Sequence, residues 1–258
     1  MRQRYKIRLP PIQPNKLDQD EAYFLIEEGR EVKRIRFHDY RELYRRPGLY
    51  EQLFYDRLKC VSPFVVADIL KKVVSNAGGG LSQMRVLDVG AGNGIMAEAL
   101  IKLGVARIVG LDILEDAKLA AERDRPGLYD AYYALDLSKM SNGLREEFSE
   151  WHLNCMTTVA ALGFGDIPAR AFLEAYNLID ENGWIAFNIK ETFLENRDTS
   201  GFSVFVKNLI LTDHFDIHHL ERYQHRLSID GAPLYYYAAV GKKNRNIEPS
   251  FLATLSPG

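Results

Sequence analysis

The sequence predicts a doubly wound α/β fold, in which helices cover both faces of a mostly parallel sheet. In residues 85–100, RVLDVGAGNGIMAEAL, a short apolar strand runs into a glycine-rich turn and then into an apolar helical pattern. From there, predicted strands and helices alternate as they do in βαβ units. Three successive predicted strands also end in an aspartate, at positions 88, 112 and 136, so that each follows the last by 24 residues.

The segment before this core, residues 1–80, is expected to form an arm and a cap. Two β-prone runs flank Gly29 and indicate a hairpin. Asp39 is placed to cap the helix that follows it, and Gly78 to Gly80 form a link into the core. The expected elements are an extended arm at 1–20, a hairpin at 23–37, and helices at 39–44, 49–59 and 62–74.

Residues 81–245 are expected to form the main domain, and residues 246–258 a loose tail. The strands are expected at 86–89, 108–112, 132–135, 154–162 and 184–189. Helices are expected at 94–103, 115–123, 143–150, 168–179 and 202–211. Two further strands at 215–220 or beyond and 234–240 are expected to be joined by a turn at 230–233.

The glycine-rich turn has the residues of a ligand site. Gly90, Gly92 and Gly94 allow the backbone to approach a ligand closely, and the helix start offers free N–H groups. A dinucleotide fingerprint would need a small residue at position 95, where the chain has Ile95. Asp88 would repel a pyrophosphate, whereas its carboxylate suits a cationic ligand such as S-adenosylmethionine, which carries an ammonium and a sulfonium.

The aspartates at the next two strand ends extend this interpretation. Asp112 is placed to accept hydrogen bonds from both ribose hydroxyls, and Asp136 from an adenine amino group. Each aspartate could instead cap the helix that follows it. The regular spacing of the three favours the cofactor.

The segments VLDVGAGNG, GLDI and ALDL resemble the first three motifs of class I S-adenosylmethionine-dependent methyltransferases, within a similarity that spans about residues 84–242. VAALGFGDIP and DENGWIAFNIKE are similar to small-molecule methyltransferases, including the Williams–Beuren-region methyltransferase-like group. The resemblance implies a Rossmann-like seven-stranded sheet with an antiparallel last strand, and S-adenosylmethionine as cofactor. The implied cofactor-binding residues are Asp88, Gly90, Ala91, Gly92, Gly94, Asp112, Ile113, Leu135, Asp136, Leu137, Val159 and Ala160.

Tyrosines are concentrated before the core, where Tyr40, Tyr44, Tyr50 and Tyr55 follow one another closely. Each could simply pack, but together they could line a pocket, because their rings bind an organic substrate while their hydroxyls orient it. We expect Tyr40 or Tyr44 to reach the cofactor or substrate cavity. Glu191, at the end of the fifth strand, is expected to face the same rim of the sheet. No catalytic base is assigned.

These observations predict methyl transfer to a small-molecule acceptor. Amino-group methylases of nucleic-acid bases usually carry an Asn/Asp-Pro-Pro-aromatic run after the fourth strand, and residues 161–166 lack it. The net charge of −2 also gives no reason to expect a nucleic-acid partner. Two other function classes stay open: a nicotinamide-dependent oxidoreductase, which Asp88 and Ile95 disfavour, and a cofactor-binding protein without catalysis.

Composition and cysteine usage point to a cytoplasmic protein. No window approaches the ~20 apolar residues of a membrane span, and the N-terminus lacks the apolar core of a secretory signal. The two cysteines, Cys60 and Cys155, are expected to be buried free thiols. His214 and His218 alternate with apolar residues as in a strand, so we predict no metal site. Whether the protein forms a homodimer is left open.

Overall fold

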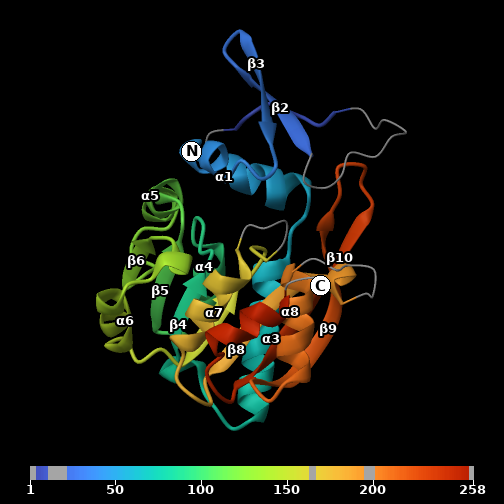
Figure 1. Ribbon diagram of the computed structural model, residues 1–258. Helices are drawn as coiled ribbons and strands as arrows, with labels where there is room; N and C mark the ends of the chain where they lie inside the picture. Colours follow the sequence, from blue (N-terminus) through green and yellow to red (C-terminus); the bar gives the residue numbers. More distant parts are fainter. Residues whose placement is uncertain (1–3, 11–21, 163–166, 195–200, 256–258) are drawn as a thin grey trace.

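The computed structural model describes residues 4–10, 22–162, 167–194 and 201–255 (Figure 1). Its main domain is built on a seven-stranded sheet with the strand order β6-β5-β4-β7-β8-β10-β9. The strands are β4 (Arg85–Val89), β5 (Arg107–Asp112), β6 (Ala131–Ala134), β7 (Cys155–Thr158), β8 (Trp184–Lys190), β9 (Phe215–Leu227) and β10 (Pro233–Lys243). The first five are parallel, and β10 runs antiparallel between β8 and β9. The predicted doubly wound fold with an antiparallel last strand is therefore confirmed.

Two apolar cores lie on the two faces of this sheet, because successive side chains of each strand point to opposite faces. On one face Leu87 and Met156 pack with the helices α6, α7 and α8; on the other, Val86 and Cys155 pack with α3 and α4. The helices are α3 (Ser62–Asn76), α4 (Ile95–Lys102), α5 (Glu115–Asp124), α6 (Asn142–Ser149), α7 (Ala169–Asn177) and α8 (Gly201–Leu211). Within the described residues, no helix is both long and apolar enough to cross a membrane.

The N-terminal segment forms a cap that lies beyond the carboxyl ends of the parallel strands (Figure 1). Phe24, Phe37, Leu43 and Leu53 give the cap an apolar core of its own. Its elements are β1 (Ile7–Arg8), β2 (Tyr23–Glu28), β3 (Glu31–Arg36), α1 (Tyr40–Arg45), α2 (Leu49–Glu51) and the π-helix η1 (Gln52–Arg57). The predicted hairpin is present as β2–β3, and the Asp39 side chain caps α1 by accepting from the Glu42 N–H.

Part of the predicted extended arm is a strand, since β1 pairs with β2 and completes a three-stranded antiparallel sheet. The buried Gln52 amide supports this arrangement: its oxygen accepts from the Tyr5 N–H at 2.8 Å, and its nitrogen donates to the Tyr5 carbonyl at 2.6 Å. The Gln52 side chain of η1 thereby makes the two backbone hydrogen bonds that a neighbouring strand would make. A helix was expected over 49–59, and the chain there instead makes a single α-turn followed by the π-helix.

Two other segments depart from the sequence-based expectation. The strand predicted at 154–162 ends at Thr158, because Ala160 adopts a left-handed conformation with φ of 57° that a sheet does not accept. The first part of the predicted loose tail is packed: Ile247 is buried, and its N–H and carbonyl pair with the Asn177 amide at 2.8 Å each. A 3₁₀-helix, η5 (Pro249–Leu255), follows and contacts α8.

Candidate cofactor and substrate site

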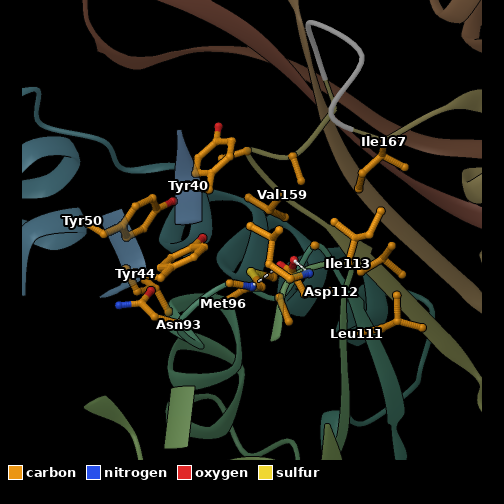
Figure 2. A pocket seen from close by; sticks show the side chains of 18 of the residues that line it. Tyr40, Tyr44, Tyr50, Asn93, Met96, Leu111, Asp112, Ile113, Val159 and Ile167 are labelled. Carbon is orange, nitrogen blue, oxygen red and sulfur yellow. Dashed lines mark hydrogen bonds between the residues drawn. The ribbon is translucent and has the colours of Figure 1, made fainter. Parts of the chain in front are cut away.

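A cavity of about 360 Å³ lies between the carboxyl ends of the parallel strands and the cap (Figure 2). Such a position is where open α/β sheets bind ligands. Its main-domain lining comprises Val89, Gly90, Ala91, Gly92, Asn93, Ile95, Met96, Leu111, Asp112, Ile113, Leu114, Leu135, Asp136, Leu137, Val159, Ala160, Ala161, Ile167, Pro168 and Ala171. The N-terminal part of the chain contributes His38, Asp39, Tyr40, Arg41, Tyr44, Tyr50, Tyr55 and Pro63.

The glycine turn lies at the centre of the lining and has no room for side chains. Gly90 and Gly92 have φ of 70° and 53°, which L-residues rarely adopt. A Cβ on Gly90 would lie 2.7 Å from the Cβ of Ala161, and one on Gly92 would overlap the Tyr44 hydroxyl. The backbone is therefore exposed to the cavity just before the start of α4, the geometry that a close-fitting polar ligand requires.

Asp112 ends β5 and holds the glycine turn. Its carboxylate accepts hydrogen bonds from the N–H groups of Gly92 and Leu114, both at 3.0 Å. Burial raises the pKa of this carboxyl, and these backbone hydrogen bonds act in the opposite direction. The side chain lines the cavity beside Ile113, so the ribose position predicted for Asp112 is open to a ligand.

Replacing Asp112 with alanine is expected to weaken binding of S-adenosylhomocysteine by about 1.5–3 kcal/mol, the size of hydrogen bonds to a charged group. Calorimetry measures this affinity, and Glu122→Ala, an exposed acid on α5, serves as the matched control. Thermal unfolding of the free variant separates lost binding from lost folding. Unchanged affinity in Asp112→Ala would refute the ribose assignment.

Asp88 lies outside the cavity lining. It is 1% exposed, and its carboxylate accepts from the hydroxyls of Tyr129 and Thr157 at 2.9 Å each. Burial is the larger effect and raises the pKa of Asp88 to about 6, while the two hydroxyls lower it. Contact between Asp88 and the methionyl ammonium of a cofactor would thus run through the backbone or a water.

The Asp88 pKa predicts a pH-dependent cost to folding. The unfolded chain releases this proton near pH ~3.9, and the native chain near pH 6. Between these values the native state binds more protons, so the contribution of Asp88 to stability falls as pH rises and is lowest above pH ~6. Asp88→Asn should therefore gain roughly 3 kcal/mol relative to the wild type between about pH 4 and pH 7. Urea unfolding of both proteins at the two pH values tests this, and a pH-independent difference would contradict it.

Asp136 acts as a helix cap and as a lining residue at once. Its carboxylate accepts from the N–H and hydroxyl of Ser138, at 3.0 and 2.6 Å, and pairs with Lys139. These contacts lower its pKa, so the group is a carboxylate at neutral pH. It caps the 3₁₀-helix η3 (Leu137–Lys139) and, with Leu135 and Leu137, lines the region predicted for adenine.

A buried polar network that was not predicted from the sequence supports the backbone after β7, where Val159 and Ala160 line the cavity. The Ala160 N–H donates to Asn188 Oδ1 at 2.7 Å, and Asn188 Nδ2 donates to the Tyr223 hydroxyl at 2.7 Å. Ser62 Oγ lies 2.6 Å from both the Tyr223 hydroxyl and His225 Nδ1. Burial lowers the pKa of His225 to about 3, so this histidine is neutral and the network carries no charge. The one sign of this network in the sequence is a polar residue, Asn188, within an apolar strand.

The cap closes the other side of the cavity with tyrosine rings. Tyr44 is 6% exposed, stacks with Tyr40 at a centroid distance of 6.2 Å, and contacts Tyr50 at 5.1 Å. Burial raises the pKa of Tyr44, Tyr50 and Tyr55, so these phenols stay neutral. Tyr40 and Tyr44 both line the cavity, and their contact with a cofactor or substrate stays a prediction.

Ionic contacts join this cap to the main domain. Arg125, at the end of α5, donates to Glu51 of the cap at 2.7 Å, to Glu98 of α4 at 2.6 Å and to the Asn93 carbonyl at 3.2 Å. The Asn93 amide in turn donates to Glu51 at 3.1 Å. A residue of the glycine turn is therefore tied directly to the cap.

Two other predicted residues lie apart from the cavity. Glu191 pairs with Arg222 and does not line it. Gly94, with φ of 87°, starts α4 beside Tyr129 and Arg125. In the described part of the chain, no group of three or more His, Cys, Asp or Glu side chains is arranged to hold a metal ion.

Comparison with known proteins agrees with this geometry. Residues 87–187 match the family model of a methyltransferase domain. A comparison with curated proteins returns no match. The methyltransferase match, with a glycine cradle that a Cβ would fill, identifies S-adenosylmethionine as the cofactor.

Solved structures share the fold at low sequence identity. A proposed RNA methyltransferase from Pyrococcus horikoshii is 14% identical over 69% of this chain and 83% of its own, with a TM-score of 0.51. A proposed hemolysin from Streptococcus thermophilus is 12% identical over 77% and 74%, also at 0.51. The N-methyltransferase NodS from Bradyrhizobium japonicum, solved with S-adenosyl-L-homocysteine, is 14% identical over 69% and 86%, at 0.46.

Proposed function

We propose that this chain, a class I S-adenosylmethionine-dependent methyltransferase, methylates a small organic molecule held between the cofactor and the cap. The observation that supports a small acceptor is the shared lining of one cavity by Tyr40, Tyr44 and Tyr50 of the cap and by the glycine turn. A volume of about 360 Å³ is in the range of small-molecule sites. A nicotinamide enzyme is not favoured, because the family match is to methyltransferases.

The chain's own residues act on this reaction by positioning and by excluding water. When bound, the cofactor supplies a methyl group already activated by its sulfonium. The backbone at Gly90 and Gly92 would accommodate its polar end, and Asp112 and Asp136, which line the cavity, would accept hydrogen bonds from its ribose and adenine. Tyr44 closes the cavity over Gly92. Holding donor and acceptor in line converts a bimolecular step into one within a complex, which lowers the barrier.

Ligand binding tests the cofactor assignment first. S-adenosylmethionine and S-adenosylhomocysteine should stabilise the folded protein by about 2.7 kcal/mol at a hundredfold excess over Kd, since they bind only the native state. Thermal shift assays with both ligands measure this, and NAD is the control. A shift with NAD and none with either sulfur ligand would contradict the proposal.

Turnover then distinguishes acceptor classes. Formation of S-adenosylhomocysteine is followed with a panel of small amines, phenols and carboxylates, with total RNA, and with a protein extract. We expect turnover with members of the small-molecule panel. Turnover confined to RNA or protein would overturn the small-molecule proposal, and cofactor binding without any turnover would favour a non-catalytic cofactor-binding protein.

A further inference from the structure

We propose that the acceptor is an amine that is methylated at nitrogen, and that the tyrosine box of the cap, Tyr40, Tyr44, Tyr50 and Tyr55, binds the ammonium product. This inference rests on the proposed small-molecule acceptor. It names the chemical class of that acceptor from the rings and charges that surround the cavity.

The tyrosine box gathers four aromatic rings on the cap side of the cavity, and Figure 2 shows three of them there. Ring centroids of Tyr44 and Tyr50 are 5.1 Å apart, and those of Tyr50 and Tyr55 are 6.1 Å apart. The negative faces of such rings attract alkylammonium ions, and Tyr and Trp cages are a general solution to binding them. Because the hydroxyls of Tyr44, Tyr50 and Tyr55 stay neutral, these residues attract a cation through their rings and not as counter-ions.

The charges of the lining are compatible with an amine. Three acidic side chains, Asp39, Asp112 and Asp136, line the cavity with one guanidinium, Arg41. Arg41 lies 3.5 Å from Asp116 of α5, and Asp136 pairs with Lys139. A bound cofactor would bring a net charge of about +1 from its ammonium, sulfonium and carboxylate, and the lining acids offset it. The site therefore has no excess of positive charge that would hold an anionic acceptor, and the attraction of an ammonium comes from the rings.

The reaction balances for a neutral amine. Its nitrogen lone pair attacks the methyl carbon while the carbon–sulfur bond breaks, and that electron pair stays on sulfur to give a neutral thioether. The positive charge moves from sulfur to nitrogen, and a proton on that nitrogen is then lost to water. The nucleophile needs no base from the protein at the moment of attack, and the ring faces of Tyr40 and Tyr50 stabilise the charge where it arrives.

Two probe molecules of the same shape separate the effect of a positive charge on binding from the effect of shape. Choline and 3,3-dimethyl-1-butanol have the same shape, but only choline is a cation, and neither can be methylated at that centre. With the protein saturated in S-adenosylhomocysteine, calorimetry should give about 5- to 30-fold tighter binding of choline, the effect of cation–π contact. Equal affinities, or tighter binding of the alcohol, would overturn the inference.

Substitutions in the tyrosine box test whether its rings cause the preference for choline. Tyr50→Leu should reduce this preference at least threefold, and so should Tyr40→Leu at the half-buried Tyr40, because each substitution removes one aromatic face. Tyr235→Leu, on β10 and outside the cavity, is the matched control and should keep it. Retained binding of S-adenosylhomocysteine shows that each variant is folded. A preference for choline that survives both Tyr40→Leu and Tyr50→Leu would contradict the role of the box.

Turnover of three acceptors with related carbon skeletons tests this inference separately from the proposed function. Phenethylamine, 4-ethylphenol and 3-phenylpropionate are compared in turnover at equal concentration. Methylation of the amine in preference to the other two supports the inference. Methylation of the phenol or the acid in preference to the amine would overturn it and leave the small-molecule function standing. Turnover with RNA or protein alone would overturn both.

Discussion

Gly92→Ala is expected to weaken binding of S-adenosylhomocysteine by about 3 kcal/mol, roughly 100-fold. Gly92 has φ of 53°, where an L-residue costs about 1–2 kcal/mol. An added Cβ would also overlap the Tyr44 hydroxyl and lie 3.2 Å from its Cζ. The turn and the cap cannot both keep their positions, and the turn is the surface that we propose contacts the cofactor. Calorimetry on the folded variant measures the effect.

Two further variants separate the effect of backbone strain at position 92 from that of the steric overlap with Tyr44. Gly104→Ala changes a residue with φ of 98° and open space around it, so it should lose stability but keep cofactor affinity. Tyr44→Phe in the Gly92→Ala background removes the overlapping oxygen and should restore part of the affinity. If Gly92→Ala binds as tightly as the wild type, the glycine turn is not the cofactor cradle.

Arg125→Met should destabilise the protein by about 3–5 kcal/mol, because removing one partner of a buried ion pair leaves the other charges unpaired. The Arg125 side chain is 8% exposed, and those of its carboxylate partners Glu51 and Glu98 are 12% and 33% exposed. Denaturant unfolding measures the loss. Amide exchange should also quicken between residues 39 and 59, because the variant loses one of the contacts that join α5 to the cap.

Arg45→Met supplies the matched control. Arg45 also joins the cap to α5, through Asp116 at 2.8 Å, but its side chain is 53% exposed. Surface pairs of this kind contribute about 0–1 kcal/mol. Equal losses in the two variants would show that burial of Arg125 adds nothing to its role.

The fold was predictable where the signal is local and periodic. The glycine turn and the aspartates at or near the ends of β4, β5 and β6 lie within single βαβ steps, and parallel strands bring their carboxyl ends to one edge. The cavity accordingly includes Asp112 and Asp136 as predicted. The amphipathic segments that became α3, α4 and α5 were likewise placed close to their observed bounds.

Residues that act through distant partners could not be predicted. Asn188 accepts from the Ala160 N–H, and it also donates to Tyr223 and to Ser62, which is 126 positions away. Arg125 reaches Glu51 across 74 positions. Nothing in the pattern around these residues marks their partners, because a single polar residue in a helix or strand is also compatible with solvent exposure. The strand β1 was not predicted for the same reason, because a strand of two residues forms only by pairing with β2.

The place of β10 between β8 and β9 has a consequence for synthesis on the ribosome. The last of the sheet's strands to be translated is the sixth in sheet order, so β8 keeps an open edge until residues 233–243 have emerged. An unpaired strand edge is a template for pairing with other chains. The edge of β8 therefore stays open to pairing with other chains while residues 191–243 are being made, and becomes protected only when β10 inserts.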